Sequence, residues 1–182
     1  MKFIQTDLPG VICVVPAVHR DERGFLMETW QANRFRDAGI DATFSQDNFS
    51  QSSRGTLRGL HYQIQQPQGK LVKVVSGEIF DVAVDLRRSS PHFGAWVGQV
   101  LSADNKHQFW IPPGFAHGFL VLSETAAVEY KCTDYYAPEY ERSIRWDDPD
   151  IGIDWPLENG EVAAMSEKDI AAPFLRDADT YA

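Results

Sequence analysis

The sequence lacks most features that would place it outside the ordinary globular class. It holds only two cysteines, Cys13 and Cys132. Both lie in apolar, strand-like runs, so we expect buried free thiols and no disulfide framework. The first seven residues lack the basic segment and long apolar run of a secretory signal. No stretch approaches the roughly 18 apolar residues that a membrane-spanning helix needs. These absences favour a cytoplasmic protein without a membrane partner.

Positive charge is also scarce, with 17 Lys and Arg against 26 Asp and Glu, a net charge of −9. The excess is confined to residues 134–182, which hold 13 acids and four bases, whereas residues 1–133 hold 13 of each. Nucleic-acid binding depends on neutralised phosphates, so we expect no such partner. We interpret the acidic part as a solvated surface. Five cations of the neutral part could still meet a small polyanion such as a diphosphate: Arg23, Arg54, Arg58, Lys70 and Lys73.

The length of 182 residues suits a single domain, 1–182, and the chain has no repeat and no low-complexity tract. Residues 31–38 predict one helix, which Gly39 ends as a C-cap. Short strand-like runs then alternate with turn residues, which is typical of an all-β sandwich or barrel. The expected strands are 43–50, 57–64, 71–76, 79–86, 96–101, 107–111, 117–122 and 126–133.

Alternation along these strands predicts which side chains share a face. Residues 80, 82, 84 and 86 lie together, and the opposite face combines Ile79 and Ala83 with Asp81 and Asp85. Such a mixed face is expected where a sheet lines a polar pocket or meets solvent. In the runs 115–121 and 126–132, the same rule places His117 and Tyr130 inward among apolar residues.

Two segments resemble the paired motifs of cupins, which are small double-sheet jelly-roll barrels. The first runs from Arg58 to Gln63, and the second from Pro112 to Phe119. Metal-binding cupins carry His-x-His and a glutamate in the first motif, but here only His61 is present. His117 of the second motif adds one more histidine, but no carboxylate accompanies the pair. Because a catalytic metal site usually has three protein ligands, we expect no bound metal.

The whole string resembles the dTDP-4-dehydrorhamnose 3,5-epimerase family from residue 2 to about 179. A lone Arg-Gly-Leu-His would be weak evidence, whereas many signatures in order are specific. The resemblance implies a cupin-type jelly roll with a few short helices, and an isomerase that uses no cofactor. The matching segments are Asp21 to Phe25 with Glu28, Gln46 to Ser50, Leu57 to Gln63, Gly69 to Arg87, Ser90 to Gly94, Ile111 to Leu122, Tyr130 to Tyr136, Ile144 to Pro149 and Ser166 to Asp169.

Epimerisation beside a C4 ketone needs a base on one face of the sugar, a proton donor on the other, and a group that stabilises the enolate oxygen. By resemblance, His61 is the base and Asp169 orients it, Tyr130 is the acid, and Lys70 lies near the oxyanion. The implied supporting residues are Arg58, Asp81 and His117. The implied contacts to the nucleotide and diphosphate are Arg23, Phe25, Glu28, Gln46, Asn48 and Arg58.

Each assignment has a plainer alternative. Ser166 and Asp169 also form a capping-box pattern, which the residues alone favour and the resemblance disfavours. Tyr130 could be a core tyrosine, and Asp81 a solvent-facing strand carboxylate. Lys70 could be a solvated loop lysine. Glu28 and Arg23 could be a surface ion pair of little energetic value.

One geometric question stays open. Arg58 and His61 are three positions apart, so a regular strand places them on opposite faces. A bulge at Gly59 would bring both into one pocket. Otherwise, Arg58 serves a different part of the site.

The functional alternatives are a family member that inverts only C3 or only C5, a catalytically silent sugar-nucleotide binding cupin, and a metal-dependent cupin enzyme. The resemblance also implies a homodimer in which residues 23–28 reach the partner's site. Two small departures from the family pattern precede Asp169: Met165, and the segment Gly160-Glu161-Val162.

Overall fold

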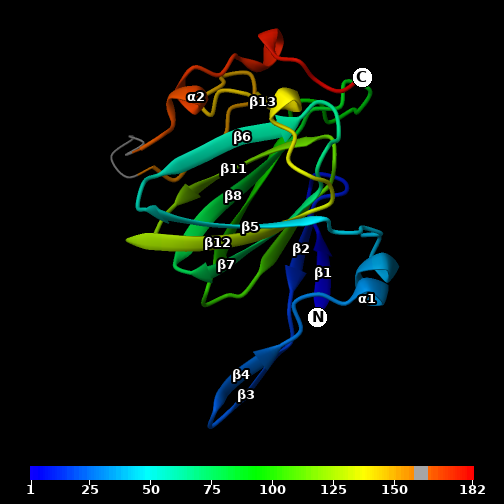
Figure 1. Cartoon of the computed structure of the whole chain (residues 1–182), viewed down its shortest axis with the longest axis vertical. Coiled ribbons are helices and arrows are strands. Elements are labelled where there is room, and N and C mark those ends of the chain that lie inside the picture. The colour runs from blue at the N-terminus through cyan, green and yellow to red at the C-terminus, as the bar shows by residue number, and fades with distance from the viewer. Residues whose placement is uncertain (158–163) are drawn as a thin grey trace.

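The computed structural model describes residues 1–157 and 164–182, and within these ranges two antiparallel sheets face each other as a barrel (Figure 1). The larger sheet has the strand order β1-β2-β10-β7-β12-β5, and the smaller has the order β13-β6-β11-β8-β9. The strands are β1 Lys2–Gln5, β2 Ile12–Val15, β3 Val18–Asp21, β4 Gly24–Met27, β5 Gln46–Ser53, β6 Leu57–Gln63, β7 Lys70–Ser76, β8 Glu78–Asp85, β9 Trp96–Ser102, β10 Gln108–Ile111, β11 Phe115–Val121, β12 Thr125–Cys132 and β13 Glu141–Ser143.

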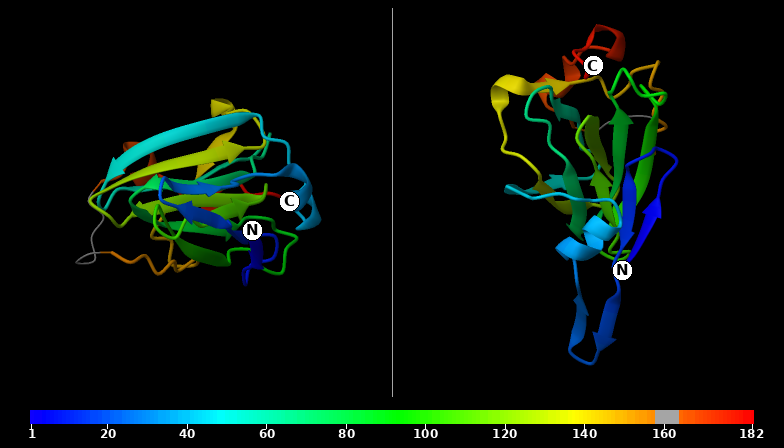
Figure 2. Two further views of the ribbon diagram at one scale, coloured as in Figure 1. Left: turned by 90° about the horizontal axis from the view of Figure 1, so that it is seen from below. Right: turned by 90° about the vertical axis from the view of Figure 1, so that its right-hand side faces the viewer.

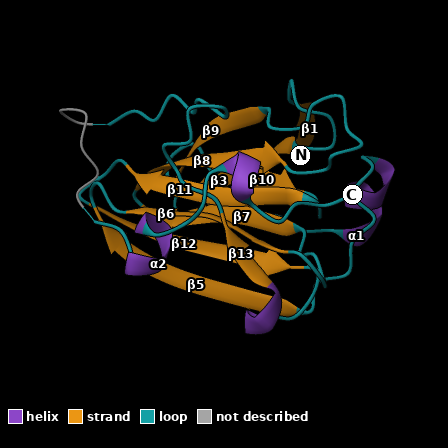
Figure 3. Ribbon diagram, turned by 90° about the horizontal axis from the view of Figure 1, so that it is seen from above, coloured by secondary structure: helices purple, strands orange, loops and turns teal. Residues whose placement is uncertain are grey.

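Helices are few and short in the described ranges, and they lie around the sheets (Figure 3). Helix α1 (Ala32–Asp37) agrees with the prediction for 31–38. Gln31 caps its start by accepting the backbone N–H of Arg34, and Gly39 follows its end with a φ of 90°. Helix α2 is Glu167–Ile170, and short 3₁₀ turns occupy Pro138–Tyr140 and Leu175–Asp177. No described helix is long and apolar enough to cross a membrane.

The main core lies between the sheets and confirms the alternation predicted for β11 and β12. Phe115 and Phe119 of β11 meet Ala126 and Val128 of β12 in one buried cluster, and Tyr130 packs against it. Strand β8 buries both of its faces, because its other side meets a second cluster under the C-terminal segment. The expectation that the face with Asp81 and Asp85 could meet solvent was therefore wrong, since both are fully buried.

The C-terminal segment covers the outer face of the smaller sheet. Ile151, Trp155 and Leu175 pack there against residues of β6 and β8, and Met165 contacts the edge of the same cluster. The Tyr62 hydroxyl donates to the Asp179 carbonyl, which ties β6 to this segment. The departure at Gly160 to Val162 lies outside the described residues.

The eight predicted strands are confirmed, with shifts of a few residues at their ends. The sequence analysis missed β1 to β4 and β13, which have only three or four residues each. Strands β3 and β4 form a separate hairpin that projects away from the barrel (Figure 2). Its tight turn ends at Gly24, whose φ of 125° is hard for other residues to adopt. Such short strands give too few alternating positions to be recognised from periodicity.

Candidate active site

A cavity of about 270 Å³ opens between the sheets, beside the edge strands β5 and β13. One wall comes from β6 of the smaller sheet, and the opposite wall comes from β5, β7 and β12 of the larger sheet. Polar side chains dominate this lining. They are Gln46, Asn48, His61, Tyr62, Gln63, Gln68, Lys70, Tyr130, Tyr136 and Glu141.

His61 lies on the β6 wall and contacts Asp169, which α2 brings over the strand. The distance between His61 Nε2 and Asp169 Oδ1 is 2.5 Å. Burial would raise the pKa of Asp169, but hydrogen bonds from His61, Ser166 and the backbone of Gly59 hold it below its ordinary value. Ser166 also caps α2, because its Oγ accepts the Asp169 backbone N–H at 3.1 Å. The backbone of Asp169 thus joins the helix cap, while its carboxylate contacts the histidine.

A β-bulge in β6 places Arg58 and His61 on the same side of the sheet. On β11 their partners are Phe119 and His117, which are two positions apart, so two residues of β6, Gly59 and Leu60, oppose the single residue Gly118 of β11. Gly59 makes this possible with a φ of 124°, and a Cβ there would lie 2.5 Å from the Cα of Gly118. The bulge considered at Gly59 is therefore present, but Arg58 is exposed and is not among the residues that line the cavity with His61.

Below His61, the buried pair His117 and Asp81 links β11 to β8. His117 Nε2 lies 2.9 Å from Asp81 Oδ2, and Asp81 Oδ1 has no hydrogen-bond partner among the described residues. Burial lowers the pKa of His117 and raises that of Asp81. Both shifts favour the uncharged form of the side chain concerned. Lys70 acts electrostatically on both residues, which places its charge beside them.

Tyr130 and Lys70 occupy the wall opposite His61, on the neighbouring strands β12 and β7. Burial raises the pKa of the Tyr130 phenol, Cys132 adds to the shift, and Arg58 opposes it. Burial lowers the pKa of Lys70, although Cys132 and Asp81 oppose the shift. The phenol therefore keeps its proton at neutral pH, while the ammonium is easier to deprotonate than an ordinary lysine.

Gln46 and Asn48 line the cavity from the edge strand β5. Gln46 Nε2 donates to Asn48 Oδ1 at 3.0 Å, and Asn48 Nδ2 donates to the sulfur of Cys132 at 3.5 Å. Gln46 Oε1 accepts the backbone N–H of Tyr136 at 2.8 Å. Both predicted residues thus line the cavity, and Gln46 also holds the backbone of Tyr136 at its opening.

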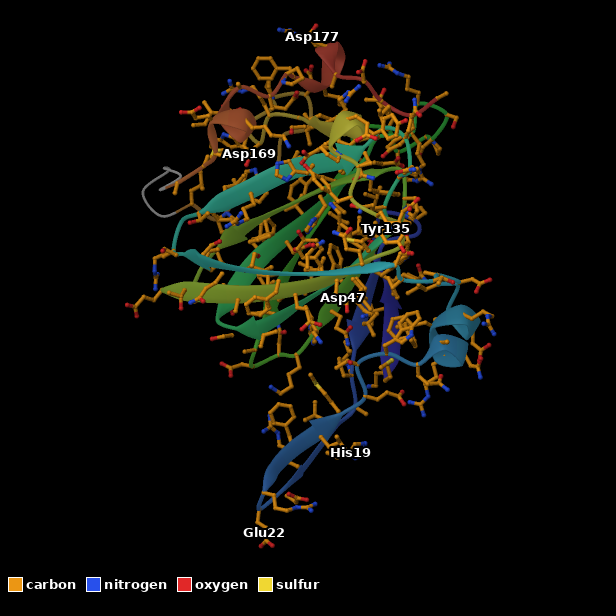
Figure 4. The ribbon with its side chains drawn as sticks, in the orientation of Figure 1. His19, Glu22, Asp47, Tyr135, Asp169 and Asp177 are labelled. Atoms are coloured by element: carbon orange, nitrogen blue, oxygen red, sulfur yellow. The ribbon has the colours of Figure 1, made fainter. Side chains whose placement is uncertain are left out.

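Three predicted residues lie elsewhere. Arg23, Phe25 and Glu28 belong to the β3–β4 hairpin or directly follow it, and the cavity lining described above includes none of them. Arg23 pairs with Asp21, and Glu28 pairs with Arg34 at 3.0 Å. Figure 4 labels Glu22 on the hairpin, on the far side of the barrel from Asp169. Arg23, Phe25 and Glu28 therefore do not line this chain's own cavity, and their contact with a ligand in a partner's cavity stays a prediction.

The sequence analysis missed Tyr136 and Glu141 as part of the cavity. The Tyr136 hydroxyl donates to Glu141 Oε2 at 2.7 Å, and Lys168 forms an ion pair with the same carboxylate. Burial alone would raise the pKa of Glu141, but Lys168 and Tyr136 hold it below its ordinary value. Tyr136 stood within a family-matching segment, whereas no pattern pointed to Glu141, because β13 is too short to be recognised.

Among the described residues, no group of three His, Cys, Asp or Glu side chains could hold a metal ion. The Nε2 atoms of the two inward histidines, His61 and His117, both face carboxylates. Cys13 and Cys132 are free and buried.

The barrel and this cavity define a cupin-type enzyme that can move protons. A carboxylate-supported histidine stands on one wall and a protonated phenol on the other, with a lysine beside the phenol. Such an arrangement can remove a proton from one face of a substrate and return one to the opposite face.

The sequence profile of the dTDP-4-dehydrorhamnose 3,5-epimerase family matches residues 5–177. The chain is 55% identical over 182 residues to the dTDP-4-dehydrorhamnose 3,5-epimerase of Pseudomonas aeruginosa, and the match covers 100% of this chain and 99% of that protein. It is 54% identical to the enzyme of the same name from Methanothermobacter thermautotrophicus, with 99% and 97% covered. A crystal structure of dTDP-6-deoxy-D-glucose-3,5-epimerase from Legionella pneumophila, in complex with dTDP-4-keto-L-rhamnose, superposes with a TM-score of 0.94 at 56% identity, covering 98% of this chain and 94% of that one.

The chain belongs to the dTDP-4-dehydrorhamnose 3,5-epimerase family and is an isomerase. This confirms the family, the fold class and the enzyme class that the sequence predicted.

Proposed function

We propose that this chain converts dTDP-4-dehydro-6-deoxy-D-glucose to dTDP-4-dehydro-L-rhamnose by inverting C3 and C5, in the pathway to dTDP-L-rhamnose. The observation that carries the proposal is the pairing of His61 with Asp169 on one wall of the cavity, opposite Tyr130. The full-length identity of about 55% to enzymes of this name supports the substrate.

The C4 ketone acidifies the hydrogens on C3 and C5, because the carbanion left by deprotonation is delocalised as an enolate. His61 removes such a proton and becomes an imidazolium, which the Asp169 carboxylate stabilises. Tyr130 then donates its proton to the same carbon from the opposite face, and the configuration inverts. Proton exchange with water restores both residues, so no oxidant, reductant or cofactor is consumed.

The enolate oxygen needs a positive partner in a partly dry site. Lys70 serves this role, and the negative charges at Asp81 and Glu141 favour its protonated form. The buried His117–Asp81 pair links two strands of the smaller sheet and so supports the side of the cavity that carries His61.

Gln46, Asn48 and Arg58 contact the nucleotide and diphosphate from the mouth of the cavity. Arg58 is exposed and its Nε donates to Ser52 Oγ at 3.0 Å, so its remaining guanidinium N–H groups can reach a phosphate. The relative from Legionella was crystallised with dTDP-4-keto-L-rhamnose, which supports a dTDP-linked ligand here.

The functional unit is a homodimer in which the β3–β4 hairpin supplies Arg23, Phe25 and Glu28 to the partner's cavity. The hairpin projects from the barrel, and Phe25 and Leu26 expose 51% and 75% of their surfaces. Exposed apolar side chains on a projecting hairpin suit a protein contact. The enzyme acts in the cytoplasm, where its two free cysteines stay reduced.

Two alternative functions can be distinguished from this one by experiment. A family member that inverts one carbon would share the catalytic residues above and differ in the shape of its pocket. A silent binding module would bind dTDP without moving protons.

The decisive experiment follows deuterium by NMR, with the protein, dTDP-4-keto-6-deoxyglucose, heavy water and a chelator. Entry at both C3 and C5 supports the double epimerase, and entry at one carbon supports the single epimerase. Binding of dTDP without entry supports the silent module. His61→Ala is expected to abolish exchange and retain dTDP binding, whereas His92→Ala, outside the cavity, keeps full exchange.

A further inference from the structure

Gln63 is a buried amide at the end of β6, with only 3% of its surface exposed. Its Nε2 donates to the carbonyls of Gln66 at 2.8 Å and Tyr135 at 3.2 Å. Its Oε1 accepts the backbone N–H of Ala137 at 2.9 Å. One side chain therefore uses both of its N–H donors and its oxygen on the backbones of two separate loops.

Those two loops carry part of the cavity wall. The first, residues 64–69, joins β6 to β7 and carries Gln68, and the second, residues 133–137, follows β12 and carries Tyr136. Gln68 Nε2 also donates to the Asp134 carbonyl at 2.8 Å. Figure 4 labels Tyr135 at this place, above the start of β5.

A second link joins the same loops without Gln63. The Gly69 backbone N–H donates to Thr133 Oγ1 at 2.8 Å, and the Thr133 N–H donates to the Gly69 carbonyl at 3.0 Å. This pair extends the β7–β12 ladder, so the strands stay registered when the amide is removed. What Gln63 adds is the position of the loop tips, where Tyr136 lies.

We propose that Gln63 is a positioning residue that fixes Tyr136 and Gln68 at the mouth of the cavity and thereby sets the affinity for the dTDP-linked substrate. The inference rests on the proposed function for the identity of the ligand. Gln63 contributes no proton to the reaction, because its side-chain amide does not titrate and is hydrogen-bonded to backbone groups of the two loops. Loss of the amide leaves two carbonyls and one N–H without a partner, and the loops shift to reach water.

The test compares Gln63→Met, which keeps the length of the side chain, with Gln65→Met, an exposed position in the same loop. In Gln63→Met, we expect KM and the Kd of dTDP to rise roughly tenfold, which matches the loss of one or two hydrogen bonds between the ligand and the displaced Tyr136 and Gln68. The kcat is expected to stay within roughly twofold, because the proton-transfer residues are untouched. Gln65→Met is expected to match the wild type in all three.

A double-mutant cycle separates positioning from a general loss of stability. If Gln63 acts through Tyr136, then Gln63→Met adds little to the Kd of dTDP in a Tyr136→Ala background. Additive effects, or a fall in kcat at unchanged KM, would overturn the proposal. Should Gln63→Met fail to fold, Gln63→Asn, which keeps an amide but is one methylene too short to reach both loops, takes its place. Because Kd is measured without turnover, an inactive wild type would refute the proposed function and leave this test intact.

Discussion

His61 Nε2 lies 2.5 Å from Asp169 Oδ1, although 108 positions separate the two residues in the chain. The contact fixes the histidine tautomer, because a proton held between Nε2 and the carboxylate leaves the lone pair on Nδ1. The carboxylate is itself held by Ser166 and by the backbone of Gly59 at the bulge of β6. The same bulge that aligns Arg58 with His61 thus also anchors the partner of the base.

Asp169→Asn is expected to lower kcat by a factor on the order of 10² to 10⁴, because the amide permits the wrong tautomer and cannot stabilise an imidazolium. Steady-state kinetics measures this loss. The control is Ser166→Ala, which removes the helix cap and should cost about 1 kcal/mol of unfolding free energy with a much smaller effect on kcat. Equal losses of kcat in both variants would show that Asp169 matters only for the cap.

Tyr130→Phe separates the two halves of the reaction. Without the phenol, His61 still removes and returns protons on its own face, so deuterium exchange on that side continues while inversion falls by roughly 10²-fold or more. NMR of the substrate in heavy water distinguishes the two products. Tyr135→Phe, whose side chain is 66% exposed, serves as the control. Parallel loss of exchange and inversion would mean that Tyr130 orients the sugar and does not protonate it.

The sequence predicted the barrel well, because its central strands are long enough to show the alternation of side chains between the two faces of a sheet. The inward placement of His117 and Tyr130 followed from period two alone, and the structure confirms it. The burial of Asp81 could not be read in this way, since a carboxylate on a mixed strand face fits a pocket or a wet surface equally well. Its fully buried partner His117 lies on a different strand, and pairing between strands is a tertiary property.

The roles of the site residues could be predicted only from the family resemblance, and not from local sequence patterns. Asp169 shows the limit, because its local sequence specifies a helix cap, and only the packing of α2 on β6 brings its carboxylate to His61. Arg23 and Glu28 illustrate a different point. They belong to or directly follow a hairpin that projects from the barrel, so their predicted ligand contacts depend on a second subunit and not on the fold of this chain.

Gly118→Ala tests the bulge directly. A Cβ at this position would lie 2.8 Å from the Arg58 carbonyl and 3.0 Å from a methyl carbon of Leu60, so β6 must move away from β11. We expect a loss of about 1–3 kcal/mol in unfolding free energy and a loss of activity beyond what stability explains, because His61 shifts with β6. Urea unfolding and kinetics on the folded protein measure the two effects.

Gly98→Ala is the matched control for this change. A Cβ there would meet the ring of Phe80, on the far side of the smaller sheet from the cavity, so it should destabilise the fold without altering kcat. A Gly118→Ala enzyme with wild-type kcat would contradict the role given to the bulge.

The alkaline limb of the pH–kcat profile should belong to Lys70 and not to Tyr130. Burial lowers the pKa of Lys70 below its ordinary 10.5, so the ammonium loses its charge at a lower pH than a solvated lysine does. Burial raises the pKa of the Tyr130 phenol above 10, so its proton is retained longer. The two shifts have opposite directions, so we expect the cation that stabilises the enolate to be lost before the acid as pH rises.

Lys70→Arg keeps a positive charge at every accessible pH, because a guanidinium does not deprotonate in this range. We expect a lower kcat from the altered geometry and an alkaline limb displaced to higher pH, measured between about pH 7 and 11, a range that brackets the ordinary lysine pKa. Lys73→Arg is the matched control on the same strand, where Lys73 pairs with Glu129 at 3.1 Å outside the cavity, and it should leave the limb in place. A different outcome would contradict this prediction: the alkaline limb keeps its pH in Lys70→Arg and disappears from the exchange profile of Tyr130→Phe. The limb would then report deprotonation of the phenol, and a group other than Lys70 would stabilise the enolate.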